Sequence, residues 1–435
     1  MSTGQDEVLT AIRSALTPEL RHGRRVVVGL SGGLDSVVLL YALTQLRDAM
    51  GFELSAVHVH HGLSPNADDW AVFCESLCDA WRVPCTVERI QLADPTGKGI
   101  ERVAREGRYA AFAAASGDVL CLAHHQNDRA ETLLLNLFRG AGATGLAGLP
   151  RSRTLGGMRL LRPLMELPRA TLEAWAALHQ LRWIEDESNQ DLRYRRNHIR
   201  HKLLPVIAEV FPGGVTVLAR AAAQMQEQMQ LLDRLAESEA ATCRDTAGHI
   251  SVARLQLLPE PALRNLLRYS FGKAGVQIPS ARRLMALAAQ ILSATTDSES
   301  FVRMGTVGVH LWRDHVWLDP AMDQPLPEVA VLTPGEQAWP DGALMVASQA
   351  ANLPKLQVRP VGQGQRFQPM GRCRDTVTEL LRAKGVPPWI RARLPGVWSG
   401  NTLIWVAMLG PSASAQAEGV AGDTACWVGA SPVRL

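Results

Sequence analysis

The stretch from residue 26 to residue 40, VVVGLSGGLDSVVLL, joins two apolar runs through a short polar turn. The run at 26–30 is typical of a buried parallel strand, and the residues from Val37 onward fit one face of a helix. The glycines of the turn at 31–33 allow a sharp bend and a close approach of a ligand to the backbone. Because a helix N-terminus offers free N–H groups and a positive dipole end, the stretch predicts a phosphate-binding loop. It lacks the lysine that the P-loop pattern requires.

The same turn admits two other interpretations. Residues 29–33 match G-x-S-x-G, the nucleophile elbow of α/β-hydrolases, with Ser31 as the nucleophile. Such an elbow normally follows several strands, and here too little chain precedes it to form them. The turn also fits a plain strand–helix connection that binds nothing. This stretch alone leaves the three interpretations open.

Other predicted strands also end in polar residues. The elements alternate, with strands at 26–30, 54–60, 83–92 and 118–123 and helices at 5–20, 66–82, 101–115 and 168–181. This alternation predicts an α/β fold, with an N-terminal doubly wound, mostly parallel sheet that carries helices on both faces. Ligands of such sheets bind beyond the carboxyl ends of the strands. The polar residues that fall at these ends are Ser31, His60, His61, His124 and Asp128.

The length of 435 residues predicts two or three domains, because single cores stop growing near ~250–300 residues. Breaks at 212–214 and 320–327 divide the chain into three predicted domains, 1–214, 215–320 and 321–435. We expect a catalytic domain, then a mainly helical domain that begins with a long helix at 215–241, and finally a small α+β domain. The expected later elements are one arm of a hairpin at 310–318, a helix near 374–384 and strands at 402–409.

The seven cysteines are scattered and contain no C-x-x-C pair. This pattern favours reduced thiols over a disulfide framework or a zinc site. The N-terminus shows no secretory signal, and no apolar run approaches the ~18 residues of a membrane span. We therefore expect a cytoplasmic protein without a membrane partner. With a net charge of +3, any surface that binds nucleic acid must be a local patch.

Two basic segments predict contact with RNA. The run RYRRNHIRHK at 193–202 offers cations for phosphates and Tyr194 for base stacking. Eight basic residues lie between positions 359 and 393, with Trp389 and Trp398 among or beside them. A solvated surface is the alternative for either segment, and the residues alone leave that choice open. The arginines expected to contact RNA are Arg193, Arg195, Arg196, Arg200, Arg382, Arg391 and Arg393.

Taken in order, the motifs resemble those of the bacterial tRNA(Ile)-lysidine synthetases, a family of the N-type ATP pyrophosphatases. The matching pieces are SGGLDS at 31–36, HVHHGLSPNADDW at 58–70, HHQNDRAETLLLNLFRGAGATGLAGL at 124–149, RPL at 162–164, EDESNQDLRYRRNHIRHKLLP at 185–205 and LLRAKGVPPWIRARLPGVW at 380–398. The first is common to these pyrophosphatases, and the others are more specific. Relatives often carry two adjacent acids where this chain has Asn127 and Asp128, so only Asp128 supplies a carboxylate.

The resemblance implies an adenine nucleotide alpha hydrolase-like fold and a reaction in two steps. The wobble cytidine of the CAU anticodon of tRNA(Ile) attacks the α-phosphate of ATP, and L-lysine then expels AMP, which changes decoding from AUG to AUA. The residues implied to bind ATP are Ser31, Gly32, Gly33, Leu34, Asp35 and Ser36. Asp35 would also hold Mg²⁺. Asp128 and Glu131 would orient and deprotonate the lysine with help from Arg105, so the implied catalytic residues are Asp35, Asp128 and Glu131.

Alternatives to this function stay open. Thiolation of tRNA by a related ATP pyrophosphatase would need a reactive cysteine pair near the loop, whereas a non-catalytic tRNA-binding protein would not need Asp128 and Glu131. The histidines could ligate zinc, although hydrogen bonding near phosphates or core packing explains them as well; they are His58, His60, His61, His124 and His125. The pattern GAGATG at 140–145 follows a helix rather than a strand, so we reject a dinucleotide site there. The oligomeric state is open, with a homodimer as one candidate.

Overall fold

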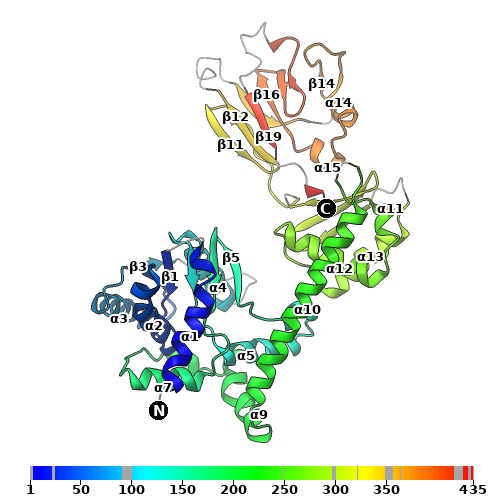
Figure 1. The fold of residues 1–435 in the computed structure, drawn as a ribbon. Helices are drawn as coiled ribbons and strands as arrows, with labels where there is room; N and C mark the ends of the chain where they lie inside the picture. The colour runs from blue at the N-terminus through cyan, green and yellow to red at the C-terminus, as the bar shows by residue number, and fades with distance from the viewer. Residues whose placement is uncertain are drawn as a thin grey trace. The chain divides into compact units, whose positions relative to one another are not determined.

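The computed structural model describes residues 3–21, 25–90, 100–246, 248–295, 300–320, 322–347, 356–362, 364–415, 425–429 and 433–434. The chain divides into two compact units, Met1–Leu231 and Leu232–Leu435. The elements of each unit can be followed by colour and label in Figure 1. Helix α10 (Gly214–Cys243) begins in the first unit and ends in the second.

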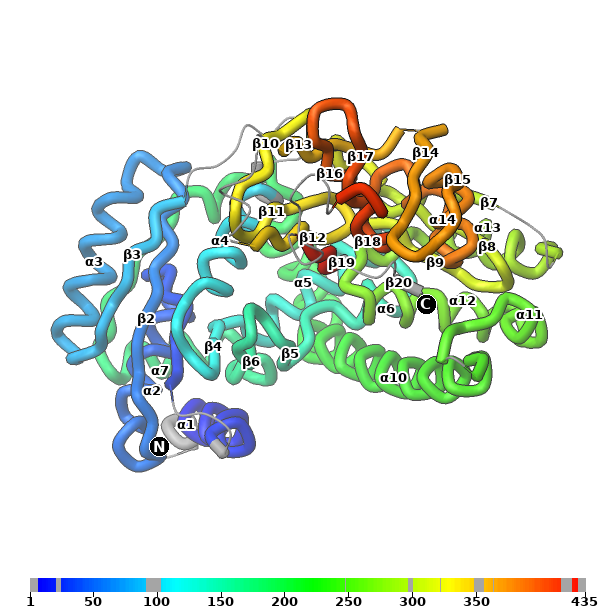
Figure 2. The backbone as a smooth tube through the Cα atoms, turned by 90° about the horizontal axis from the view of Figure 1, so that it is seen from above, coloured from blue at the N-terminus to red at the C-terminus, as the bar shows by residue number. Residues whose placement is uncertain are grey.

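The first unit is built on a six-stranded sheet in the order β3-β2-β1-β4-β6-β5, which Figure 2 shows from its β3 edge to β5. The strands are β1 (Arg25–Gly29), β2 (Glu53–His60), β3 (Cys85–Arg89), β4 (Val119–Cys121), β5 (Ser152–Leu155) and β6 (Met158–Leu161). All neighbours are parallel except β5, which pairs antiparallel with β6. The chain leaves β1 for β2 on one side and later returns to β4 on the other side of β1. The carboxyl ends of β1 and β4 therefore form the switch point at which open α/β sheets bind ligands.

Alternate residues of β1 belong to different cores. Val26 and Val28 pack into the core formed with α1 (Thr3–Leu16), α2 (Leu34–Met50), α3 (Ala67–Ala80) and α7 (Arg169–Leu178). Val27, between them, packs into a second core with Phe112 of α4 (Ile100–Ala114). A period of two with both faces buried is what a parallel sheet requires. The predicted doubly wound sheet is confirmed.

Two features of this unit differ from the sequence prediction. The helix predicted at 5–20 ends at Leu16 and is followed by a separate 3₁₀ turn, η1 (Glu19–Arg21). The pattern at 152–161 predicts no strand, yet it forms the hairpin β5–β6, whose arms of four residues are too short to show a period. The end of the predicted strand at 83–92 lies outside the described residues.

The segment after β4 carries the remaining short helices of the first unit. They are α5 (Gln126–Leu137), α6 (Ala143–Leu146), η2 (Glu187–Gln190), α8 (Arg195–His198), the π-turn η3 (Ile199–Leu203) and α9 (Leu204–Val210). Ala130 and Leu134 of α5 pack against Ile199 and Leu204. This apolar contact brings the basic segment at 193–202 beside the start of α5.

The second unit begins with helices and a four-stranded sheet in the order β20-β9-β8-β7. Their bounds are α11 (Val252–Leu255), α12 (Glu260–Lys273), α13 (Ala281–Ser293), β7 (Ser300–Met304), β8 (Val307–Trp312), β9 (His315–Asp319) and β20 (Val433–Arg434). The prediction of one hairpin arm at 310–318 is wrong, because this range contains the turn between β8 and β9. Arg313 and Asp314 both have positive φ there, at 50° and 61°, as a type I′ turn requires, without the usual Asn-Gly signature.

The last part of the chain is a small antiparallel α+β region, as predicted. Its strands are β10 (Ala330–Val331), β11 (Gly335–Trp339), β12 (Gly342–Val346), β13 (Gln357–Pro360), β14 (Arg366–Phe367), β15 (Asp375–Thr376), β16 (Pro395–Ser399), β17 (Thr402–Val406), β18 (Gly410–Pro411) and β19 (Ala425–Gly429). With α14 (Val377–Ala383) and α15 (Pro388–Arg391) they enclose one apolar core. Among the described residues, no single helix is long and apolar enough to cross a membrane, and Arg195–Val210 with Gly214–Cys243 pass that test only as a pair bent by 103°.

Candidate active site

The loop between β1 and α2 is closed by its own hydroxyl groups. Ser36 Oγ accepts from the Ser31 N–H at 3.2 Å and donates to the Gly33 carbonyl at 2.9 Å. Ser31 Oγ in turn accepts from the Gly33 N–H at 3.3 Å. The first N–H groups of α2, at Leu34 and Asp35, have no carbonyl within the helix to bond. The loop therefore presents backbone donors at the positive end of a 17-residue helix.

Gly32 and Gly33 serve this loop in different ways. Gly32 has φ +84°, and a Cβ on it would lie 2.5 Å from Ile184 Cδ1 and 3.1 Å from Cys74 Sγ. The Gly32 carbonyl also accepts from the Ile184 N–H at 2.9 Å, so the chain near residue 184 holds the loop from one side. Gly33 has φ −74°, and a Cβ there would meet nothing closer than 3.6 Å. The fold thus requires glycine at position 32, whereas position 33 borders open space.

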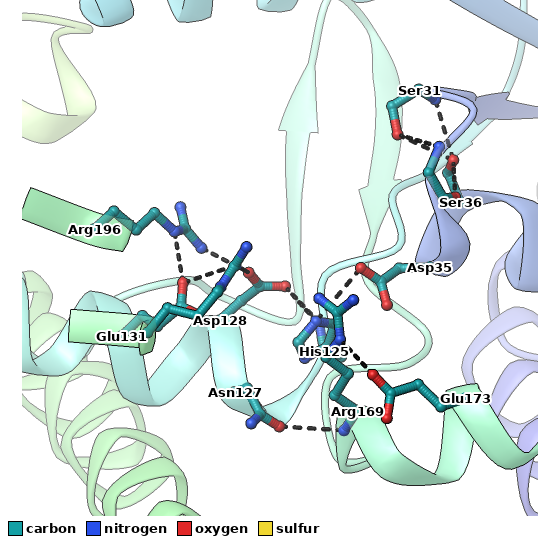
Figure 3. A network of polar contacts seen from close by, with 12 residues as sticks. Ser31, Asp35, Ser36, His125, Asn127, Asp128, Glu131, Arg169, Glu173 and Arg196 are labelled. Carbon is teal, nitrogen blue, oxygen red and sulfur yellow. Dashed lines mark hydrogen bonds and ion pairs between the residues drawn. The ribbon is translucent and has the colours of Figure 1, made fainter. Parts of the chain in front are cut away.

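His125 lies between the loop and the acidic residues of α5, as Figure 3 shows. Its Nε2 is 3.6 Å from Asp35 Oδ2 and 3.5 Å from Asp128 Oδ2. Asp128 Oδ2 also accepts from the His125 backbone N–H at 3.0 Å. Because His125 follows β4 and Asp35 follows β1, the switch point of the sheet brings these two side chains together.

Burial and neighbouring charges shift the pKa values of His125 and Asp128 in opposite directions. Burial alone would lower the pKa of His125, but Asp128 and Asp35 outweigh it and raise the pKa above its ordinary value. Burial would raise the pKa of Asp128, but His125 and Arg196 outweigh it and hold that pKa far below the ordinary range. Asp128 is therefore a stable carboxylate near neutral pH. It is a weak proton acceptor.

Asp128 and Glu131 are paired with two arginines of the basic segment. Arg196 donates to Asp128 Oδ1 and to Glu131 Oε2, both at 2.7 Å. Arg200 donates to Glu131 Oε1 at 2.6 Å and to Glu131 Oε2 at 3.1 Å. Glu131 itself is 0% exposed. The guanidinium groups of Arg196 and Arg200 pair with these carboxylates, and their contact with RNA stays a prediction.

Three family models match the chain: the PP-loop domain over residues 5–207, the TilS substrate binding domain over 250–317 and the TilS substrate C-terminal domain over 356–427. A tRNA(Ile)-lysidine synthase of Nitrosomonas europaea is 35% identical over 429 residues, which cover 95% of this chain and 93% of the relative. The enzyme of that name from Azoarcus sp. is 39% identical over 425 residues, 94% of this chain and 93% of the relative. The chain belongs to the tRNA(Ile)-lysidine synthase family. Among solved structures, the U34-tRNA thiolase NcsA from Methanococcus maripaludis has a TM-score of 0.46 at 17% identity and covers 52% of this chain and 79% of its own.

As a member of the tRNA(Ile)-lysidine synthase family, the chain is a ligase of tRNA modification with an ATP-binding PP-loop domain. The three matched ranges fall one in each of the predicted domains 1–214, 215–320 and 321–435. The compact units divide the chain elsewhere, after Leu231, which lies inside α10, whereas the first predicted boundary lies where α10 begins.

The remaining arginines expected to contact tRNA lie in different environments. Arg193 pairs with Asp191 at 2.7 Å, and Arg195 is exposed. In the C-terminal part, Arg382 keeps 62% of its side chain exposed beside Glu379. Arg391 Nε donates to the Val386 carbonyl at 2.7 Å.

Arg393 is largely buried and paired within the chain, and its role in binding tRNA stays a prediction. Its guanidinium donates to both carboxylate oxygens of Asp319 at 3.0 Å and to Asp341 at 2.8 Å. Only 11% of the Arg393 side chain is exposed. A cation that is already paired with two buried carboxylates has little charge to offer a phosphate.

Cys74 and the motif histidine His58 lie beside each other, with 3.4 Å between Cys74 Sγ and His58 Nδ1. Cys74 is buried beside the loop, where burial raises the pKa of its thiol to about 12, so it is a poor nucleophile. His58 Nδ1 is 2.9 Å from the Leu30 carbonyl. The described His, Cys, Asp and Glu side chains do include one group spaced for a metal, Asp245 with His249 and His315, which contains none of the motif histidines.

Sequence reasoning did not find the roles of Ile184 and Asn127. Ile184 carries no polar side chain, and only its contact with Gly32 reveals its role. Asn127 Oδ1 accepts from the Arg169 N–H at 3.1 Å and so joins α5 to the start of α7. An oxygen acceptor at position 127 therefore serves the fold, and an aspartate would supply the same acceptor.

Proposed function

We propose that this chain joins free L-lysine to the wobble cytidine of the CAU anticodon of tRNA(Ile), with ATP as the source of energy, and releases AMP and pyrophosphate. The observation that carries the proposal is the placement of the PP-loop and the Asp128–Glu131 pair at the two sides of one switch point, with His125 between them. One side offers donors for phosphates. The other offers carboxylates for an ammonium group.

In the first step the cytosine oxygen attacks the α-phosphate of ATP. The N–H groups at Leu34 and Asp35 and the hydroxyls of Ser31 and Ser36 would hold the departing pyrophosphate. Asp35 Oδ1 is buried and has no hydrogen-bond partner among the described residues, as expected for a carboxylate that awaits a cation. Asp35 would therefore hold Mg²⁺, which neutralises phosphate charge when bound.

In the second step the lysine amine replaces AMP on the ring carbon. The ammonium of free lysine has a pKa of ~10.4, so it must first lose a proton to the solvent. Because the pKa of Asp128 is held so low, we assign Asp128 to orienting the ammonium rather than to removing its proton. Asp128 Oδ2 accepts one backbone N–H and keeps a lone pair for that task. Glu131 would position Arg196 and Arg200 around the same site.

The direct test incubates the protein with a tRNA(Ile) transcript, ATP and labelled lysine, followed by nuclease digestion. We expect label in the wobble nucleotide, together with one AMP and one pyrophosphate for each lysine transferred. The methionine tRNA, which shares the CAU anticodon, is the matched control for substrate choice. Asp128→Asn should weaken the use of lysine more than the adenylation of tRNA. Label in another nucleotide, or transfer without ATP, would contradict the proposal.

For tRNA recognition we propose the exposed arginines Arg195 and Arg382, together with Arg193. Arg382→Ala should lower the slope of log affinity against log salt by about 0.7–0.9 for each phosphate that the arginine neutralises in the wild type. A slope equal to that of the wild type would remove Arg382 from the tRNA surface. We also keep the three-domain division 1–214, 215–320 and 321–435 as a proposal.

A further inference from the structure

A second cationic group lies at the same rim of the sheet and surrounds Tyr109. The guanidinium carbons of Arg105 and Arg153 lie 5.5 Å and 4.7 Å from the centre of the Tyr109 ring. Arg162 donates from a terminal nitrogen to the Tyr109 hydroxyl at 3.3 Å. Three cations from α4, β5 and the end of β6 therefore converge on one aromatic side chain.

Arg162 is the buried member of this group, with 2% of its surface exposed. Its other donors reach His124 Nδ1 at 3.2 Å and the Pro150 carbonyl at 2.6 Å. Burial lowers the pKa of His124 to about 3, so this ring is neutral and supplies no counter-charge. Neutral acceptors thus orient Arg162 without compensating its charge.

These three arginines differ from Arg196 and Arg200 in one respect. Arg196 and Arg200 are paired with Asp128 and Glu131, whereas none of Arg105, Arg153 and Arg162 forms an ion pair with a carboxylate in the described part of the chain. A buried cation without a counter-charge is costly, and the usual compensation is an anion. Burial would raise the pKa of the Tyr109 phenol, but Arg162, Arg105 and Arg153 outweigh burial and lower that pKa. The electrostatic potential at the Tyr109 hydroxyl is therefore positive.

The fold builds this arrangement through a close backbone contact. At the turn of the β5–β6 hairpin, Gly156 has φ +55°, and a Cβ on it would lie 2.4 Å from the carbonyl oxygen of Ala113 in α4. The hairpin turn therefore packs closely against the last turns of α4, and this packing places Arg153 over the ring of Tyr109. Arg162 links the group to the active site through His124, the neighbour of His125.

We propose that Arg105, Arg153 and Arg162 around Tyr109 form an oxyanion site for a substrate of the reaction. Planar guanidinium groups suit both a phosphate diester and a carboxylate. Two sources offer this chemistry: a backbone phosphate of the anticodon loop, and the α-carboxylate of lysine, which rests on the function proposed above. Either anion would lie beside the carboxylates that are assigned to the ammonium, but at a place of opposite charge.

The test uses Arg153→Gln and Arg105→Gln, because both side chains are exposed and form no hydrogen bond with another residue that the structure describes. The control is Arg13→Gln, the same charge change on an exposed residue of α1, a helix that packs on α2 and α7. Binding of the tRNA(Ile) transcript is measured by filter retention over a range of salt, and binding of lysine and of 1,5-diaminopentane by calorimetry. Thermal unfolding checks that each variant is folded.

If the anion is a phosphate, Arg153→Gln weakens tRNA binding by about tenfold and lowers the salt slope by about one unit, while lysine binding is unchanged. If the anion is the carboxylate, tRNA binding is unchanged, lysine binding weakens by about tenfold and the preference for lysine over 1,5-diaminopentane disappears. If neither ligand distinguishes both variants from Arg13→Gln, the oxyanion site is refuted. Both experiments measure binding, so they test the oxyanion site even if the wild type transfers no lysine. A wild type that transfers no lysine would refute only the proposed function.

Discussion

Replacing Glu131 by glutamine isolates the role of the buried acid that the sequence suggested as a catalytic residue. Glu131 is 0% exposed and accepts three N–H groups, one from Arg196 and two from Arg200, at 2.6–3.1 Å. A residue kept for catalysis alone usually leaves the fold unharmed, or more stable, when its charge is removed. Here the removal would leave two arginines facing Asp128 as their sole remaining carboxylate.

Breaking a buried ion pair typically costs about 3–5 kcal/mol. The glutamine oxygen can still accept one hydrogen bond, so we expect the lower end, about 3 kcal/mol. For a unit of about 200 residues this corresponds to a fall in Tm of about 6–12 °C. The assay is thermal and urea unfolding of Glu131→Gln beside the wild type.

The double variant Glu131→Gln with Arg200→Gln removes one charge of each sign and serves as the control. We expect it to be more stable than the sum of the single effects by about 1–3 kcal/mol, because the unpaired cation is gone. If Glu131→Gln is as stable as the wild type and the double variant shows no coupling, the arginine pairing does not hold this site together, and the argument from charge fails.

The remaining predictions concern the loop, His125 and Arg393. Gly33→Val should fold but lose ATP binding in equilibrium dialysis, and wild-type ATP affinity in this variant would exclude the phosphate role of the loop. Gly32→Ala should lose about 1–3 kcal/mol of stability, because φ +84° and the contact with Ile184 both exclude a Cβ at that position. The pKa of His125 is raised in the folded state. The wild type should therefore be more stable than His125→Gln below about pH 6.5, and this difference should fade as the pH rises through the folded pKa. A difference that grows with pH in urea titrations would contradict this. Arg393→Ala should destabilise the protein by about 3–5 kcal/mol in urea unfolding, since Asp319 and Asp341 would lose their paired cation. A lower salt slope for tRNA with unchanged urea stability would contradict this structural role and favour contact with RNA.

The parts of the fold that follow from local pattern were predictable. Val26, Val27 and Val28 form a run without polar alternation, so a strand buried on both faces could be predicted, and the structure confirms it. The β5–β6 hairpin could not, because four-residue arms offer too few positions to show a period. The turn at Arg313 and Asp314 was hidden for another reason: tertiary packing imposes positive φ on residues that do not prefer it.

The candidate site also has one part that the sequence predicts and one part that it does not. The residues of the loop are contiguous, so the sequence places them together. The partners of Asp128 and Glu131 lie about 70 positions further along the chain, in a basic run that also resembles a surface for RNA. Charge alone cannot say whether an arginine such as Arg196 faces a phosphate or a carboxylate of its own chain. The sequence also did not reveal the partners of Arg393, since Asp319 and Asp341 lie far before it in the chain.

The two groups of arginines at the rim suggest how one surface can distinguish the two ends of an amino acid. Around His125, the carboxylates of Asp35, Asp128 and Glu131 balance nearby cations, so an ammonium entering there meets acceptors that are already oriented. Around Tyr109, no carboxylate in the described part of the chain forms an ion pair with the three cations, and the proposed anion would supply the missing charge. Both places depend on residues that closely follow β4, because His124 contacts Arg162 of the Tyr109 group whereas His125 contacts the carboxylates. A ligand with separated charges would therefore meet a negative site around His125 and a positive site around Tyr109. On the proposals above, such a ligand is lysine or the anticodon loop with its backbone phosphates.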